Sequence, residues 1–317
     1  MELCSNMTSG TTLVLGGRGL VGSAIILAAE ASGENVISPP SSSLDLRQRD
    51  EVNAFFDHCK PARVYLAAAI VGGILENSRN PVTFVNDNVL MQTHVLEAAF
   101  RTGVEHLMLL GSSCIYPRAC KQPMREVDLM TGPLEPTNSA YAMAKLVGLE
   151  QILAYNRQHG TRWLYVIPPN VYGPRDHFFS DKSHVISALI TRVHEAKLSG
   201  SIEVGVWGTG SAKREFIYVE DLARMLVRLM DMAEVPTPIN TGTGSDVSIR
   251  ELAETIVEVI GYQGSLAWDA TKPDGMPRKL MDSAAMIATG VAPAFGLRDG
   301  LALTYRWFVN NYDSLKR

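Results

Sequence analysis

Residues 13–22 read Leu13-Val14-Leu15-Gly16-Gly17-Arg18-Gly19-Leu20-Val21-Gly22, a short apolar run that leads into glycines spaced G-x-x-G-x-x-G and then into a helical pattern over 20–31. Without side chains, the first glycines let the backbone turn sharply and approach a pyrophosphate, and the last lets the helix pack against the strand. The helix N-terminus then faces the anion. The stretch predicts a dinucleotide-binding strand–loop–helix unit, and the alternative is an ordinary βα turn.

The first half of the chain alternates short apolar runs with helical patterns, which indicates a parallel sheet covered by helices on both faces. Runs such as residues 107–110 are continuously apolar, as strands buried on both faces should be. We expect a Rossmann-type doubly wound α/β domain. The predicted strands are 13–15, 36–38, 63–68, 106–110 and 163–167, and the predicted helices are 20–31, 52–59, 85–102 and 141–159.

After Pro174 the segments become shorter and richer in Gly and Pro, which indicates a smaller C-terminal α/β region for substrate. We expect a flexible N-terminal extension at 1–11, a dinucleotide-binding domain at 12–174 and a mainly substrate-binding domain at 175–317, with some segments returning to the first domain. Helices are predicted at 183–197, 220–232, 249–260 and 301–312, and strands at 204–207 and 265–268.

Composition excludes several classes of protein. The 317 residues carry 29 basic and 33 acidic side chains, a net charge of −4, so the overall basic field typical of nucleic-acid and anionic-membrane binders is absent. The cysteines show no C-x-x-C pairing, so neither a metal site nor a disulfide framework is expected, and free thiols are typical of a reducing compartment. With no signal-like or membrane-spanning apolar segment, we expect a cytoplasmic, unanchored protein. The cysteines are Cys4, Cys59, Cys114 and Cys120.

The end of the second predicted strand bears on the choice of cofactor. An NAD site usually has an acidic residue there for the ribose 2′-hydroxyl, whereas this segment reads Val36-Ile37-Ser38-Pro39-Pro40. NADPH is therefore favoured, with Arg18 as a partner for the 2′-phosphate, and the alternative for Arg18 is a solvated loop residue. Asp45 is expected near the adenine.

A Tyr-x-x-x-Lys pattern at Tyr141 and Lys145 places a phenol and an ammonium one helical turn apart. A phenol ordinarily titrates near 10, so it exchanges protons at neutral pH only if a nearby cation stabilises the phenolate. The pattern follows the segment 111–117 at the carboxyl end of a buried strand, where ligands bind in open α/β sheets. Together these features predict a proton-transfer site at the edge of the sheet where the dinucleotide would bind.

With these motifs the chain resembles the extended short-chain dehydrogenase/reductase family, whose members combine this glycine loop, a Ser or Thr after the fourth strand, and Tyr-x-x-x-Lys. It is most similar to the members that epimerise a GDP-linked 4-keto-6-deoxy sugar at C3 and C5 and then reduce C4. The shared stretches span nearly the whole chain and lie at 19–25, 66–69, 71–73, 110–117, 134–138, 183–186, 206–210, 214–216, 272–275 and 277–279.

The resemblance implies that Ser112, Tyr141 and Lys145 serve hydride transfer and that Cys114 and His184 form an acid/base pair. This is chemically coherent, because C3 and C5 both flank a C4 ketone whose enolate oxygen Ser112 and Tyr141 could stabilise. Inversion needs one group to remove a proton and another to return it from the opposite face, and thiol and imidazole pKa values lie close enough to neutrality for both tasks. We favour Cys114 as the base and His184 as the acid.

The resemblance also implies the binding residues, an NADPH cofactor, a GDP-sugar substrate and a homodimer. Nucleotide-sugar contacts are expected at Val185, Leu189, Arg192, Trp207, Arg214, Asp274 and Lys279. Cofactor contacts are expected at Gly16, Gly17, Arg18, Gly19, Leu20, Val21, Gly22, Asp45, Leu46, Leu66, Ala67, Ala68, Lys145, Pro168, Asn170, Val171 and His184.

Alternatives remain open at this stage. Cys114 could be a buried apolar residue and His184 a structural residue at a helix start. The substrate could be another nucleotide-linked keto-sugar, such as a heptose or a 3-deoxy sugar, and a non-catalytic NADPH-binding protein is a third possibility. The chain also departs from the family at Pro169 and Ile70, where Thr and Lys are usual, and at Arg175 and His177, where His and Asn are usual.

Overall fold

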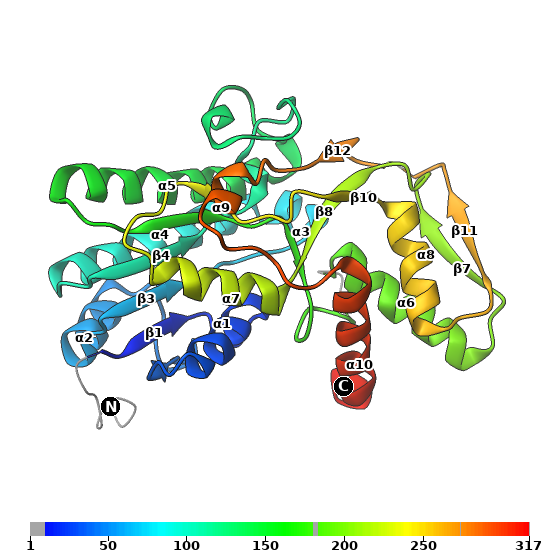
Figure 1. Ribbon diagram of the computed structural model, residues 1–317, viewed down its shortest axis with the longest axis horizontal. Coiled ribbons are helices and arrows are strands. Elements are labelled where there is room, and N and C mark those ends of the chain that lie inside the picture. The colour runs from blue at the N-terminus through cyan, green and yellow to red at the C-terminus, as the bar shows by residue number, and fades with distance from the viewer. Residues whose placement is uncertain (1–9, 180–182, 273, 317) are drawn as a thin grey trace.

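The computed structural model describes residues 10–179, 183–272 and 274–316. Most of the expected N-terminal extension at 1–11, and Pro273 of the shared stretch 272–275, lie outside these residues. The elongated molecule has two lobes, with a parallel sheet and its helices in one and the elements around β7, β8 and β11 in the other (Figure 1).

Within the described residues, six parallel strands form the larger sheet in the order β2-β1-β3-β4-β5-β9. The chain passes from β1 outward to β2 and then returns to β3 on the other side of β1, so the strand order reverses at β1. This confirms the predicted doubly wound parallel sheet. The strands are β1 (Thr12–Leu15), β2 (Val36–Ile37), β3 (Arg63–Leu66), β4 (His106–Leu110), β5 (Leu164–Ile167) and β9 (Ile239–Asn240).

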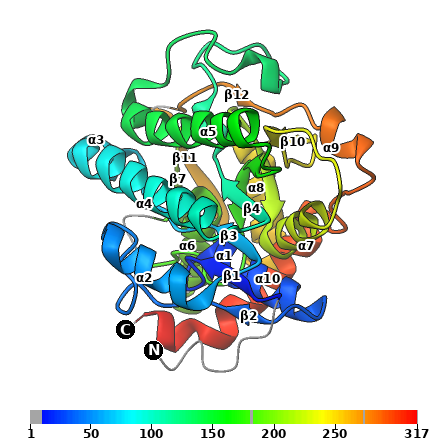
Figure 2. The same ribbon diagram turned by 90° about the vertical axis from the view of Figure 1, so that its left-hand side faces the viewer.

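Helices cover both faces of this sheet (Figure 2). The strand side chains alternate between the two helix layers. Leu13 and Leu15 of β1 point into a core shared with α2 (Arg49–Cys59), α4 (Pro81–Arg101) and α5 (Ser139–His159). Val14 points into the core under α1 (Leu20–Ala31) and α7 (Val219–Met230). We call this sheet with its helices, together with the short α3 (Ile74–Arg79) and α9 (Ala284–Ala288), the parallel-sheet lobe.

The other lobe is organised around β8 and is called the β8 lobe. The strands β6, β10 and β12 all pair with β8, while β7 pairs with β11, and three longer helices pack against these strands (Figure 1). This confirms the smaller α/β region. Its elements are β6 (Asn170–Tyr172), α6 (Val185–Ser199), β7 (Glu203–Trp207), β8 (Lys213–Tyr218), β10 (Asp246–Ser248), α8 (Ile249–Ile260), β11 (Ser265–Asp269), β12 (Arg278–Lys279) and α10 (Leu297–Leu315).

The sequence reading missed several elements that hold the lobes together. Strand β8 begins with Lys213, Arg214 and Glu215, a polar start without the apolar run that marks the parallel strands. Helix α7 packs on α1, and β9 then extends the large sheet beside β5, so the chain re-enters the parallel-sheet lobe after β8. Strand β9 is only two residues long, too short for a periodic signal.

The cysteines differ partly from expectation. Cys114 and Cys120 carry free thiols, but Cys59 is disulfide-bonded, so the expectation of free thiols is wrong there. No helix within 10–179, 183–272 and 274–316 is long and apolar enough to cross a lipid bilayer. Over the same ranges, no cluster of His, Cys, Asp and Glu side chains has the grouping needed to hold a metal ion.

Candidate active site

The glycine loop lies at the carboxyl end of β1, where the strand order reverses and ligands bind in doubly wound sheets. Gly16 has a φ of +92°, and a Cβ there would lie 2.6 Å from the backbone nitrogen of Ala68, which follows β3. A Cβ on Gly22 would lie 2.2 Å from the carbonyl oxygen of Gly16. Only glycine fits at these positions, so the loop presents backbone rather than side chains to the crevice.

The start of α1 fits a phosphate group. Its N-cap residue is Gly19, and no side chain caps the helix, so the N–H groups of the first turn face the crevice without a side-chain acceptor. Arg18 is exposed and makes no ion pair with any described residue. The residues present therefore fit the pyrophosphate of a dinucleotide, with Arg18 within the same loop. Leu20 and Val21 are half-buried in the first turn of α1.

The other cofactor positions predicted from sequence lie along the same edge of the sheet or at its margin. Leu66 ends β3, and Ala67 and Ala68 follow it, half-buried beside the glycine loop. Asp45 is already engaged, because its carboxylate forms an ion pair with Arg47 at 2.8 Å. The remaining members are Leu46, which is buried, and Pro168, Asn170 and Val171, which follow β5 or start β6.

Replacement of Gly22 by alanine should weaken NAD(P)H binding by about 10- to 100-fold, because the new methyl group collides with the backbone of Gly16 and overpacking of this kind costs about 1–3 kcal/mol. Fluorescence titration of the reduced cofactor measures the effect. Gly205→Ala is the matched control, since a Cβ there meets nothing within 4 Å. Equal affinities of the Gly22→Ala and Gly205→Ala variants would contradict the assignment of this loop.

Ser112 and Cys114 lie in a tight turn after β4. Ser112 caps a 3₁₀ turn at Ser113–Ile115, and its Oγ accepts a hydrogen bond from the backbone nitrogen of Cys114 at 3.4 Å. The backbone nitrogen of Ser113 donates to the carbonyl of Pro168 at 3.2 Å, which fixes the turn to the segment after β5. Cys114 is 8% exposed. The hydroxyl and the thiol therefore sit together at the crevice.

Tyr141 and Lys145 face this turn from α5. The Lys145 Nζ donates to the carbonyl of Leu110, the last residue of β4, at 2.7 Å and lies 5.9 Å from the centre of the Tyr141 ring. Burial lowers the pKa of Lys145 to about 8. Burial raises the pKa of Tyr141, with a further increase from the charge of Cys114, whereas the hydroxyl of Ser112 lowers it. The structure thus brings the predicted serine, tyrosine and lysine together.

Two cations from the β8 lobe complete this cluster. Lys279 on β12 lies opposite Arg214 on β8 in the strand register, and burial lowers the pKa of both side chains. Burial also raises the pKa of Cys114, while the charges of Lys279 and Lys145 act in the opposite direction. The thiol is therefore near two ammonium groups, and adjacent cations that are partly desolvated favour an anionic ligand.

His184, the remaining predicted catalytic residue, lies on a different element, at the start of α6. It is the exposed N-cap of α6, and within the described residues no hydrogen bond or ion pair joins it to Cys114. Its neighbour is the buried Asp176: burial raises the pKa of this carboxyl, and the charge of His184 is the largest influence that lowers it. The backbone nitrogen of His177 donates a hydrogen bond to the Asp176 carboxylate at 2.8 Å.

The remaining substrate positions lie farther along the β8 lobe. Leu189 is fully buried in its core and offers no surface to a ligand, whereas Val185 is half-buried at the start of α6. Trp207 is 70% exposed, with the Lys272 Nζ 5.8 Å from its ring centre. Asp274 accepts hydrogen bonds from the backbone nitrogen and the hydroxyl of Thr209, both at 2.7 Å.

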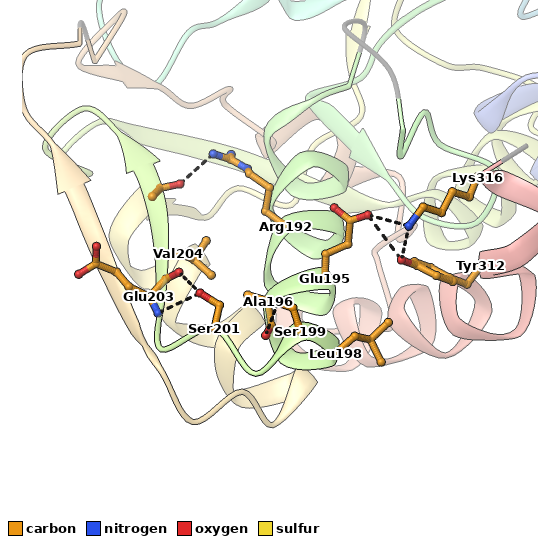
Figure 3. A pocket seen from close by; sticks show the side chains of 11 residues that line it. Arg192, Glu195, Ala196, Leu198, Ser199, Ser201, Glu203, Val204, Tyr312 and Lys316 are labelled. Atoms are coloured by element: carbon orange, nitrogen blue, oxygen red, sulfur yellow. Dashed lines mark hydrogen bonds and ion pairs between the residues drawn. The ribbon is translucent and has the colours of Figure 1, made fainter.

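Arg192 borders an open pocket of about 640 Å³ between α6, β7 and the end of α10 (Figure 3). Its guanidinium donates to the carbonyl of Gly205 at 3.0 Å and to that of Ala188 at 3.2 Å, so it points along α6 toward β7. On the opposite side of this pocket, Glu195 pairs with Lys316 at 3.4 Å. In the described part of the chain, no hydrogen bond or ion pair joins Arg192 to the Cys114 cluster.

The fold and the cluster define a class: a nucleotide-binding α/β protein with a reductase-type Ser–Tyr–Lys set next to a buried thiol. Residues 12–242 match the model of the NAD dependent epimerase/dehydratase family, and the chain belongs to this family. The assignment places it among NAD(P)-binding proteins.

Relatives with similar full-length sequences narrow the comparison. The chain is 49% identical to the probable GDP-L-fucose synthase 1 of Oryza sativa subsp. japonica, covering 97% of this chain and 94% of the relative. It is 42% identical to the GDP-L-fucose synthase of Escherichia coli, covering 98% and 100%. The crystal structure of a GDP-L-fucose synthetase from Naegleria fowleri bound to NADP superposes with a TM-score of 0.88 at 27% identity, covering 98% of each chain.

The sequence did not reveal several buried side chains that hold the backbone next to the cluster. Gln92 on α4 donates to the carbonyl of Ala144 at 2.7 Å, and Tyr165 on β5 donates to the carbonyl of Lys145 at 2.8 Å, so both hold α5 where Lys145 emerges. Asn88 holds the backbone of Ile70 through its amide at 2.8 and 3.0 Å. Helical spacing alone does not distinguish these buried amides from ordinary polar residues, because their partners are distant in sequence.

Proposed function

We propose that the protein converts GDP-4-keto-6-deoxy-D-mannose to GDP-L-fucose, by epimerisation at C3 and C5 followed by reduction at C4 with NADPH. The observation that carries the proposal is the meeting of Ser112, Cys114, Tyr141 and Lys145 at the mouth of a dinucleotide crevice. Lys279 lies near the thiol, and Arg214 lies opposite Lys279. Similarity to GDP-L-fucose synthases over nearly the full chain supports this substrate.

Epimerisation follows from the placement of the thiol. In the proposed reaction, Cys114 removes the proton from C3 or C5, and Ser112 and Tyr141 donate hydrogen bonds to the C4 oxygen as negative charge develops there. Lys145 and Lys279 both act to lower the pKa of Cys114 and so favour its basic form. His184, the exposed N-cap of α6, returns a proton from the other face.

Reduction uses the same oxyanion contacts. When bound, the nicotinamide supplies the hydride that reduces C4. Tyr141 donates its phenolic proton to the C4 oxygen, and Lys145 stabilises the phenolate that remains. Ser112 keeps the carbonyl oxygen in reach of Tyr141. The choice of NADPH over NADH rests on Arg18 and on the absence of an acidic residue at the end of β2.

The proposed homodimer would use the outer surface of α4 and α5. Exposed apolar side chains on these helices include Val82, Leu90 and Phe100 on α4 and Met143 on α5. Two long adjacent helices with exposed apolar residues can form an isologous contact with a second copy of themselves.

The proposal is tested with purified protein, the keto-sugar substrate and NADPH in deuterated water. We expect oxidation of NADPH, deuterium at C3 and C5, and GDP-L-fucose as the product identified by NMR. Absence of both oxidation and deuterium would remove the proposal. Oxidation without deuterium would leave a C4 reductase that acts on the keto-sugar without epimerising it.

The rate of C4 reduction should fall as the pH rises above about 8. Below this pH Lys145 is protonated and can stabilise the Tyr141 phenolate, and above it the amine is neutral. The Lys145→Arg variant should be slower but should lose this decline, because guanidinium stays charged. GDP-4-keto-6-deoxy-L-galactose, the epimerised intermediate, isolates the reduction step. An unchanged decline in Lys145→Arg would show that another group causes it.

The runner-up function is epimerisation and reduction of another nucleotide-linked 4-keto sugar, such as a heptose or a 3-deoxy sugar. The same cluster would serve, since the chemistry depends only on the C4 ketone and its neighbouring C–H bonds. A panel of GDP-linked keto-sugars, compared by kcat/KM, separates these possibilities. A non-catalytic NADPH-binding protein would turn over none of them.

A further inference from the structure

Glu215 is a buried carboxylate on β8 whose partners are all backbone groups or a hydroxyl. Glu215 is only 1% exposed. Its Oε1 accepts from the backbone nitrogens of Thr243 at 2.6 Å and Gly244 at 2.8 Å, and its Oε2 accepts from the backbone nitrogen of Met281 at 3.0 Å. The Thr243 hydroxyl adds a contact at 3.3 Å. A buried anion held by N–H groups strongly restrains the segments that supply them.

These partners come from segments that are far apart in the sequence. Thr243 and Gly244 follow β9, the edge strand of the parallel sheet, and Met281 lies two residues after Lys279 of β12. Met281 also pairs with Met124 in a parallel bridge, in the segment that follows the Cys114 turn. The Glu215 carboxylate therefore joins β8 to the segment after β9 and to the segment after β12. This junction lies between the catalytic cluster and the predicted diphosphate site.

Strand geometry relates Glu215 to the two cations. Arg214 and Lys279 are opposite each other in the register and so lie on one face of the β8–β12 pair, whereas Glu215 lies on the other face. Adjacent cations repel, and β12 is only two residues long, so its own ladder holds it weakly. The position of Lys279 consequently depends on its flanking anchors. On one side is the ion pair of Arg278 with Asp246. On the other side the Glu215–Met281 bond acts together with the hydrogen bonds of Leu280 to Gln122 and Met124.

We propose that Glu215 is a positioning residue for the diphosphate of the nucleotide sugar: its carboxylate holds β12 so that Lys279 and Arg214 stand at the spacing that lets both cations contact the phosphates. The inference rests on the proposed function, because that function supplies the diphosphate. Space has been left for the carboxylate, since a Cβ on Gly242 would lie 2.3 Å from its Oε1.

The test is the Glu215→Gln variant, which keeps the size of the side chain. The glutamine side chain has only one acceptor oxygen, and its amide nitrogen is a donor. This nitrogen must face either the N–H of Met281 or the N–H groups of Thr243 and Gly244. Two donors cannot hydrogen-bond to each other, so one of the anchors is lost. Calorimetric titration should show GDP affinity reduced by about tenfold or more, with guanosine and NADPH affinities unchanged. The KM for the GDP-sugar should rise in proportion while kcat is retained. Glu254→Gln, on the exposed surface of α8, is the matched control and should bind GDP like the wild type.

A Glu215→Gln variant with wild-type GDP affinity overturns the proposal, and so does an equal loss of GDP, guanosine and NADPH binding, which is the pattern of general misfolding. If that variant fails to fold, Gly242→Ala decides. The φ of Gly242 lies outside the left-handed region, so alanine can adopt this backbone conformation. The added methyl group would displace the Glu215 carboxylate without removing its charge. The Gly242→Ala variant should therefore also lose affinity for GDP selectively. Wild-type protein that binds neither GDP nor the keto-sugar refutes the proposed function itself, whereas wild-type turnover combined with unaltered variants refutes only the role of Glu215.

Discussion

Replacement of Cys114 by serine should lower the rate of epimerisation by about 10²- to 10⁴-fold, the usual contribution of a positioned acid or base. A hydroxyl is far less acidic than a thiol, so the two nearby lysines cannot make it an effective base at neutral pH. Deuterium incorporation at C3 and C5 measures the loss directly. Affinity for NADPH should be unchanged, because the glycine loop lies at the end of a different strand.

Cys120 supplies the matched control, since it follows in the same segment as a free thiol that is only half-buried. Cys120→Ser should exchange deuterium at the wild-type rate. The Cys114→Ser variant should still reduce GDP-4-keto-6-deoxy-L-galactose, which needs no epimerisation. Wild-type exchange by Cys114→Ser would mean that another group is the base, and His184 would then be the next candidate to replace.

Replacement of Tyr141 by phenylalanine should lower C4 reduction by about 10²- to 10⁴-fold, because the proton donor to the C4 oxygen is lost while the ring and its packing remain. Loss of NADPH absorbance with the epimerised substrate measures this step. Deuterium exchange should fall less than reduction, since Ser112 still donates to the enolate oxygen. The two steps should therefore separate in this variant.

Tyr155 on the same helix offers a control of the same chemistry. It packs among Phe100, His159 and Trp163 at the far end of α5 from the cluster. Tyr155→Phe should reduce the substrate like the wild type. Unchanged turnover by Tyr141→Phe would remove the proposed proton donor and would favour a non-catalytic role or a different assignment of the site.

The parallel-sheet lobe was largely predictable from sequence because its signals are local. The strand, glycine loop and helix at 13–31 follow one another directly, and the buried strands are continuous apolar runs. The turn of Ser112 and Cys114 and the spacing of Tyr141 and Lys145 also lie within single segments. Helix α4 still began earlier than expected, at Pro81 rather than residue 85, because proline is well tolerated in the first helical turn.

The β8 lobe was less predictable because its elements depend on distant partners. Strands β9 and β12 have two residues each and exist only through pairing with β5 and β8. Arg214 was expected to bind substrate, but nothing in the sequence indicated that its neighbour Glu215 anchors segments near residues 243 and 281. Leu189 illustrates the opposite case, because a residue expected to contact substrate is fully buried in the core of this lobe.

The sequence by itself determined the doubly wound sheet, the glycine loop and the identity of the serine, thiol, phenol and lysine near the strand ends. The sheet and the loop follow from short-range rules of periodicity, turn chemistry and helical spacing, whereas the serine and the thiol were identified through the family resemblance. Only the tertiary structure decided that Lys279 stands near Cys114 with Arg214 opposite it, and that Glu215 anchors Met281 after β12. Those relations depend on contacts between residues tens to more than a hundred positions apart, and no local pattern encodes the position of such a partner.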